Sequence, residues 1–110
     1  WLSEFREKYT SVVGLPYSCL AFPATINKEI ARLLMESGCK QVGMGFQSAN
    51  EEYKSRALQR KEKKATVIRS VNLLRENGIK VTLDHIFNFP GETKEHLEES
   101  LDFHIENKNH

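Results

Sequence analysis

Cysteine is scarce in this sequence, and its scarcity excludes two kinds of protein. The 110 residues contain only Cys19 and Cys39, which stand twenty positions apart. Such a pair forms neither the Cys-x-x-Cys motif of a redox enzyme nor the disulfide framework of a small secreted domain. Free thiols are typical of reducing compartments, so we expect a cytoplasmic protein.

Long apolar runs and an excess of one charge are missing as well. No stretch approaches the roughly 20 apolar residues of a membrane-spanning helix, and no secretory signal is visible. The 16 Lys and Arg residues nearly balance the 15 Asp and Glu residues, for a formal net charge of +1. This balance provides no general attraction to nucleic acid or to an anionic membrane, and we expect neither as a partner.

Several motifs that identify catalytic or metal sites are also absent. The sequence has no helical pair of histidines and no Cys/His cluster from which a metal site could be built. It has no nucleophile elbow, and no phosphate-binding loop that ends in Gly-Lys-Ser or Gly-Lys-Thr. These classes of site are therefore excluded for this chain alone.

What the sequence does contain is a regular alternation of helix and strand patterns. Apolar periodicity predicts helices over 1–9, 27–37, 50–58, 66–77 and from Thr93 onward, and strands over 15–22, 39–46 and 79–87. The segments 33–40 and 73–80 repeat one pattern: a helix end, a glycine and the start of a strand. Near-continuous apolar strands that alternate with helices favour parallel pairing through right-handed crossovers. We therefore predict an α/β fold with three parallel strands.

Two helices carry more detailed signals. Asn27 precedes the second helix and suits its N-cap, because an Asn side chain can accept a hydrogen bond from the first turn. In the last helix, Leu97, Leu101 and Ile105 recur every fourth residue, and we expect this stripe to be buried.

The length limits how complete the fold can be. A chain of 110 residues is one small domain or part of a larger one. Three strand–helix units are too few to close an eight-stranded barrel of about 250 residues, so they would form an open sheet or a fraction of a barrel. The chain begins with Trp1 rather than methionine, which leaves open that it is a piece of a longer protein.

The loop after the second strand is the first candidate for a ligand contact, because parallel sheets bind ligands at the carboxyl ends of their strands. Gly43 and Gly45 would let a ligand or another backbone approach closely. Gln47 and Ser48 offer neutral donors and acceptors that suit hydroxyl groups such as those of a ribose. The alternative is structural, since Ser48 and Glu51 have the spacing of a capping box.

The loop after the third strand is the second candidate. Pro90 and Gly91 form a typical β-turn pair, so a tight connection to the next helix explains them. Alternatively, exposed amides at the helix start, flanked by Phe87 and Phe89, could hold a flat base by stacking.

A basic run and one histidine complete the candidates. Residues 54–64 contain six Lys and Arg residues and one Glu, which fits either a solvated helix end or an anion site. A single Arg that reaches a ligand carboxylate would be the simplest form of such a site. His85 follows Asp84 on the third strand, so the two face opposite sides of the sheet, and His85 fits a structural role better than a catalytic one.

Taken in order, these segments resemble the later half of the core domain of the radical SAM superfamily, most closely its cobalamin-binding type. The residues that carry the resemblance are 15–19 (LPYSC), 38–48 (GCKQVGMGFQS), 58–60 (LQR) and 86–93 (IFNFPGET). The resemblance covers nearly the whole chain. It implies a fragment of a partial (β/α)6 TIM-like barrel, in which residues 1–110 form a single domain fragment made of the third to fifth βα units.

The resemblance also implies roles for particular residues. Gln47 and Ser48 match a motif that contacts the ribose or methionine part of S-adenosylmethionine (SAM), and Arg60 matches a basic position near the SAM carboxylate. The motif that brackets the adenine corresponds to the segment 86–91, with contacts from Ile86, Asn88, Phe89, Pro90 and Gly91.

This sequence departs from the family pattern at three places. Position 47 is usually Glu and is Gln here, which keeps hydrogen bonding but removes a charge. Position 88 is usually Gly and is Asn, a residue that tolerates positive φ angles better than most. The Cys-x-x-x-Cys-x-x-Cys run that holds a 4Fe–4S cluster is absent, and neither Cys19 nor Cys39 matches part of it.

The resemblance therefore implies a fragment of a radical SAM enzyme of oxidoreductase or methyltransferase type. Such an enzyme uses SAM, a 4Fe–4S cluster and, in the type resembled most, cobalamin, and it cleaves SAM reductively to a 5′-deoxyadenosyl radical. This chain would supply part of the SAM-binding wall and would be inactive alone, with a small-molecule substrate that the sequence does not identify. The alternative is a non-catalytic α/β binding or assembly module. Under either hypothesis, uncovered strand edges predict self-association of the isolated chain.

Overall fold

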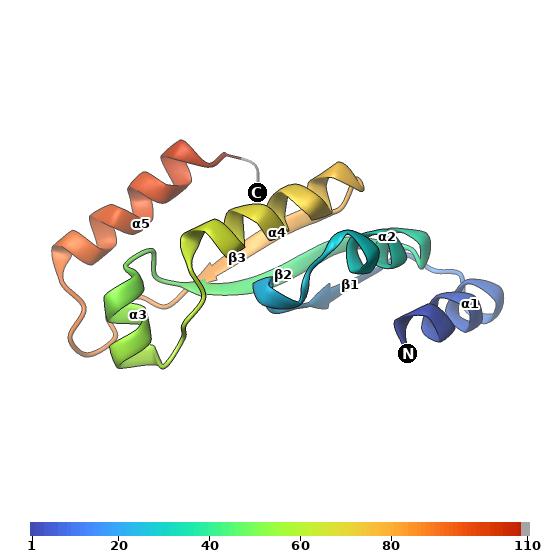
Figure 1. The fold of residues 1–110 in the computed structure, drawn as a ribbon, viewed down its shortest axis with the longest axis horizontal. Helices are drawn as coiled ribbons and strands as arrows, with labels where there is room; N and C mark the ends of the chain where they lie inside the picture. The colour runs from blue at the N-terminus through green and yellow to red at the C-terminus, as the bar shows by residue number, and fades with distance from the viewer. Residues whose placement is uncertain (109–110) are drawn as a thin grey trace.

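Helices and strands alternate along the chain (Figure 1). The structure is a computed structural model that describes residues 1–108. Its elements are α1 (Leu2–Val12), β1 (Tyr17–Leu20), the 3-10 turn η1 (Pro23–Thr25), α2 (Lys28–Glu36), β2 (Cys39–Gln47), α3 (Glu51–Leu58), α4 (Lys64–Glu76), β3 (Lys80–His85) and α5 (Lys94–Glu106). In this part of the chain, no helix is both long and apolar enough to cross a bilayer.

The three strands form one sheet in the order β1-β2-β3, and both pairings are parallel. Leu20, Gly43 and Thr82 lie side by side in its register. β1 and β2 are each followed by helical segments before the chain returns to the sheet, and β3 is followed by α5. The predicted α/β fold with three parallel strands is thus confirmed, and it is consistent with part of a TIM-like barrel.

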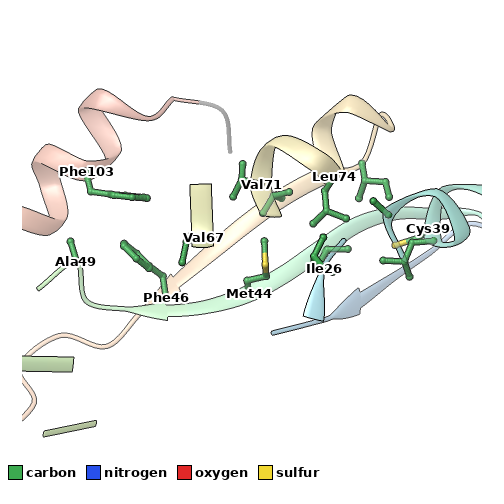
Figure 2. Packing of buried hydrophobic residues seen from close by; sticks show 14 residues of the cluster. Ile26, Cys39, Met44, Phe46, Ala49, Val67, Val71, Leu74 and Phe103 are labelled. Atoms are coloured by element: carbon green, nitrogen blue, oxygen red, sulfur yellow. The ribbon is translucent and has the colours of Figure 1, made fainter. Parts of the chain in front are cut away.

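Buried side chains join one face of the sheet to α2, α4 and α5. Val42, Met44 and Phe46 of β2 belong to a single buried cluster that also contains residues of these three helices. Figure 2 shows Leu74 of α4 above the middle of the sheet and Phe103 of α5 near Phe46. The rings of Phe46 and Phe103 are 4.4 Å apart, centre to centre. This face of the sheet therefore holds the core.

The opposite face of the sheet is open. Leu20, whose side chain is on that face, is 84% exposed. The described chain measures 49 × 25 × 20 Å and has a radius of gyration of 15.5 Å, whereas a compact domain of this size has a radius of about 13 Å. An elongated shape with one open face is what a fraction of a barrel would have.

Local signals at the ends of the helices are confirmed. The Asn27 side chain accepts a hydrogen bond from the Ile30 amide at 2.8 Å and caps α2. Gly38 and Gly78 follow α2 and α4 with φ angles of +99° and +74°, which are left-handed conformations that glycine adopts without steric cost. The repeated pattern in the sequence therefore marks two equivalent helix-to-strand connections.

The burial of α5 differs from the prediction. Leu97, Leu101 and Ile105 are 36%, 60% and 55% exposed, while Ser100 and Phe103 are buried. The physical reason is that α5 is held by its other side: Phe103 packs on Phe46, and the Ala49 amide donates to the Ser100 hydroxyl at 3.1 Å. The apolar stripe of α5 therefore faces away from the core.

Two strands are shorter than predicted. The first strand was expected over 15–22, but β1 is limited to Tyr17–Leu20, because Pro16 has no amide to donate and Leu15 is exposed. The third strand was expected over 79–87, but β3 ends at His85, after which the chain turns through Asn88 at a φ of +60°.

Candidate functional site

A cavity of about 290 Å³ lies on the open face, at the carboxyl ends of the strands. Residues from all three strands and from two loops line it: Leu20, Ala21, Phe22, Gly43, Gly45, Gln47, Arg60 and Asp84. This is the end of a parallel sheet at which ligands bind.

The floor of the cavity is bare backbone at two glycines of β2. A Cβ atom at Gly43 would lie 2.8 Å from the Leu20 side chain. A Cβ atom at Gly45 would lie 2.6 Å from Nε2 of Gln47 and 3.3 Å from Nη2 of Arg60. Larger residues at these positions would push the lining side chains into the cavity, so the two glycines keep it open.

Arg60 reaches the cavity because the chain reverses direction after α3. Gln59 adopts a left-handed conformation with φ +53°, and the Arg60 amide then donates to the Lys54 carbonyl at 3.1 Å. The guanidinium lies 5.2 Å from the centre of the Phe22 ring. The sequence did not reveal this reversal, because Gln is not a residue type that favours positive φ.

The guanidinium of Arg60 has an incomplete set of partners. Its Nη2 donates to the Gly45 carbonyl at 3.3 Å and lies 3.1 Å from Oε1 of Glu62. Its Nε is buried and has no hydrogen-bond partner among the described residues. A buried donor without an acceptor costs about 1–3 kcal/mol, and more when it is charged. Because the Arg60 side chain lines the cavity, the cavity is suited to a ligand with an anionic or other strong acceptor group.

Gln47 lines the same cavity as Arg60. It ends β2 with a φ of +70°, a strained conformation for a residue other than glycine. Its carbonyl accepts from the Ile86 amide at 3.2 Å, and its side-chain amide lies over Gly45. Gln47 therefore presents an uncharged hydrogen-bonding group to the cavity.

Ser48 is placed elsewhere. Its side chain is fully buried, and its hydroxyl accepts from the Asn50 amide at 3.3 Å. The predicted capping box of Ser48 and Glu51 is wrong. The N-cap of α3 is Asn50, which accepts from the Tyr53 amide at 2.7 Å, while the Glu51 carboxylate accepts from the Lys64 amide at 2.9 Å.

The loop after β3 is exposed and stands apart from the cavity lining described above. Its predicted site residues, all exposed, are Ile86, Asn88, Phe89, Pro90 and Gly91. The Asn88 amide donates to the Glu92 carboxylate at 2.8 Å, and the Phe89 carbonyl accepts from the Tyr53 hydroxyl at 3.3 Å. Asn88 has a φ of +60°, a left-handed conformation that Asn tolerates better than most residues other than Gly.

Asp84 and Phe22 line the cavity but were not among the predicted site residues. Strand alternation gave a usable signal for Asp84, because it faces the open side while His85 faces α5. Nε2 of His85 lies 2.5 Å from Nε2 of His104, which fits the expected structural role of His85. Phe22 follows β1 in a loop whose conformation the sequence does not specify.

The described residues do not fit an iron–sulfur cluster or another metal centre. Within residues 1–108, no group of three or more His, Cys, Asp or Glu side chains could hold a metal ion. The sulfur atoms of Cys19 and Cys39 are 3.9 Å apart, and both thiols are free. Burial, with a further contribution from Cys19, raises the pKa of Cys39 to about 12, so this thiol stays protonated at neutral pH.

The sequence and the fold are both similar to those of known proteins. The family model of the radical SAM superfamily matches residues 2–104. Two structures of the radical S-adenosylmethionine methyltransferase TsrM from Kitasatospora setae match 97% of the chain at 24% identity and a TM-score of 0.83. One of them has cobalamin and a [4Fe-4S] cluster bound, and the other has tryptophan substrate and the SAM analog aza-SAM bound.

A second enzyme has a similar fold. Coproporphyrinogen III oxidase (HemN) from Escherichia coli, a radical SAM enzyme, matches 79% of the chain at 25% identity and a TM-score of 0.71. The chain spans about a fifth of these proteins, 22% of TsrM and 20% of HemN. No curated protein matches the sequence.

Proposed function

Because this chain belongs to the radical SAM superfamily, we propose that it forms part of the SAM-binding wall of a longer radical SAM enzyme. Residues 1–110 would be its third to fifth βα units. The cluster-binding cysteines would lie elsewhere in that protein, since this sequence has only Cys19 and Cys39. The chain alone would then be inactive.

The observation that carries this proposal is that Arg60 and Gln47 line one cavity whose floor is formed by Gly43 and Gly45. SAM fits this environment, because its methionine part ends in a carboxylate that a guanidinium binds through parallel N–H groups. Gln47 would donate or accept a hydrogen bond at a ribose hydroxyl or at the methionine part. Gly43 and Gly45 would let the ligand lie close to the strand.

The remaining roles concern the adenine. The exposed rings and backbone of the segment 86–91 would bracket the base, with Phe89 held in place by the Tyr53 hydroxyl. The side chain of Ser48 is buried away from the cavity, so we assign the ligand contacts of this segment to Gln47.

The chemistry itself would come from groups bound to the longer protein. Bound SAM and a 4Fe–4S cluster together supply a 5′-deoxyadenosyl radical by reductive cleavage. This chain's residues would bind and orient SAM and exclude water from it. Cobalamin is proposed as a further cofactor because the sequence resembles the cobalamin-binding type. We propose a cytoplasmic enzyme of oxidoreductase or methyltransferase type with a small-molecule substrate, and without a nucleic acid or membrane partner.

The test is anaerobic reconstitution of the full-length protein with iron and sulfide. We expect 4Fe–4S absorption and SAM turnover, measured as 5′-deoxyadenosine or, for methyl transfer, as S-adenosylhomocysteine. Arg60→Met should raise KM for SAM at least about tenfold, because a charge-assisted bidentate contact is lost. Arg69→Met, an exposed change on α4, is the matched control and should leave KM unchanged. A cluster-loaded protein that consumes no SAM would refute the proposal.

A second candidate function is a non-catalytic binding or assembly module. The observation that favours it is the free edge of β1, where the exposed Leu20 is available to another chain. Under this hypothesis SAM turnover would be absent, while the isolated chain would associate with a partner or with itself.

A further inference from the structure

One nitrogen of the Arg60 guanidinium, Nη2, takes part in every contact that binds a carboxylate through two N–H groups. In an arginine side chain, Nε–H points to the same side as Nη2, and Cδ blocks the other side. Both edges that can bind a carboxylate through two N–H groups therefore include Nη2. In this chain Nη2 already contacts the Gly45 carbonyl and the Glu62 carboxylate, while Nε is buried without a partner. Because Nε is buried, a ligand carboxylate that binds two nitrogens of Arg60 would use Nη1 and Nη2, and it would share Nη2 with the Gly45 carbonyl and the Glu62 carboxylate.

Glu62 also interacts electrostatically with a second cation, Lys54. Its side chain is 16% exposed, less than the 26% of Arg60. Lys54 is buried, with its ammonium 4.7 Å from the centre of the Phe46 ring. Burial lowers the pKa of Lys54, and the charges of Glu62 and Glu51 counteract this shift. Glu62 is therefore shared electrostatically between the buried Lys54 and the more accessible Arg60.

We propose that Glu62 competes with the ligand carboxylate for Nη2 of Arg60 and thereby sets the affinity and selectivity of the site. This inference rests on the proposed function, in which Arg60 binds the carboxylate of SAM. Glu62 is a positioning residue: it acts on the ligand through Arg60, and Lys54 acts on Glu62. Removing the charge of Glu62 should then tighten carboxylate binding. Removing the charge of Lys54 should weaken it, because Glu62 would be left to Arg60 alone.

The experiment is a binding measurement that needs no turnover. S-adenosylhomocysteine, which carries the carboxylate, and methylthioadenosine, which lacks it, are titrated by calorimetry into the full-length protein. For S-adenosylhomocysteine we expect Glu62→Gln to lower Kd about threefold to tenfold and Lys54→Met to raise it by a similar factor. Glu62→Asp, which withdraws the carboxylate by one methylene, should fall between wild type and Glu62→Gln. Glu52→Gln, an exposed charge change on α3, should leave Kd unchanged.

Methylthioadenosine separates competition at Arg60 from a general change in the cavity. Its Kd should be the same for wild type and Glu62→Gln. The inference is overturned if Glu62→Gln leaves the Kd of S-adenosylhomocysteine unchanged or raises it, or if both ligands gain equally; the proposed function survives these outcomes. A wild-type protein that binds neither ligand refutes the proposed function and this inference together.

Discussion

The centre of the sheet and the two ends of the chain differ in how completely they bury apolar side chains. In the centre, β2 is paired on both sides and covered by α2 and α4, and Val42 and Leu74 are fully buried. At the ends, none of the described residues of α1 is buried, and α5 buries only Ser100 and Phe103. The centre of the sheet therefore buries its apolar side chains, whereas the two ends of the chain expose apolar side chains to solvent.

This difference shows what one strand needs from its neighbours. A parallel strand buries its side chains on a given face when strands pair with both its edges and helices cover that face. In the described chain only β2 meets this condition, because β1 and β3 are the edges of the sheet. The exposed apolar residues at the ends therefore lie where the sheet has an unpaired edge or a helix packs on it by only a few residues.

The largest expected effect compares one leucine from each region. Leu74→Ala in α4 removes a fully buried side chain and should lower the free energy of unfolding by about 2–5 kcal/mol. Leu101→Ala in α5 removes a side chain that is already exposed and should cost less than about 0.5 kcal/mol. Urea unfolding followed by circular dichroism measures both. Equal costs would contradict the distinction between centre and ends.

The second prediction uses the thiol at the start of the central strand. The ordinary pKa of 9.0 for Cys39 is raised to about 12 in the fold, chiefly by burial. The neutral thiol stabilises the fold fully below about pH 9, and this contribution is lost as pH rises towards 12, because the unfolded chain ionises first. Between about pH 8 and pH 10.5, wild type should lose about 1–2 kcal/mol more than Cys39→Val. If both proteins show the same pH dependence, Cys39 is not desolvated in solution.

The third prediction compares the N-cap hydrogen bond of α2, at the centre, with that of α5, at one end. Asn27 caps α2 with a hydrogen bond of 2.8 Å, and Thr93 caps α5 with one of 3.4 Å. Asn27→Ala should cost about 1 kcal/mol, and Thr93→Ala should cost less, about 0.5 kcal/mol, because its bond is longer and α5 is held less firmly. Thermal unfolding of both variants checks the order. A larger loss for Thr93→Ala would show that α5 contributes more to stability than its burial indicates.

The fourth prediction concerns exposed leucines, whose replacement should change stability least but should clearly reduce self-association of the isolated chain. We expect the isolated chain to self-associate, because β1 has a free edge and the stripe of α5 is exposed. Leu20→Lys and Leu101→Lys should each change stability by less than about 0.5 kcal/mol while shifting sedimentation towards monomer. A wild-type chain that sediments as a monomer at high concentration would contradict the expected association.

Local features of the fold could be predicted from the sequence because their causes are local. The cap at Asn27 and the glycines at 38 and 78 depend on a few neighbouring atoms, and all three are confirmed. The stripe of α5 was also visible, but its direction was not. Periodicity identifies an apolar face without saying which partner covers it, and in this chain Phe103 determines how the helix packs.

The candidate site was predictable in part. Gln47 was named from its loop and Arg60 from the family resemblance, and both line one cavity in the structure. Their proximity depends on the left-handed turn at Gln59, which no residue preference signals. The choice between Ser48 and Asn50 as helix cap also depends on backbone angles, because both residue types can cap a helix.

The hydrogen bond from the Lys64 amide to the Glu51 carboxylate has a consequence for the segment that carries Arg60. It joins the first residue of α3 to the first residue of α4 and closes the intervening chain into a ring. The conformational entropy of that ring is lost when the protein folds and not when a ligand arrives. Arg60 therefore lies on a preorganised loop. Lengthening the segment 59–63 should weaken ligand binding even if every contact in the cavity were kept.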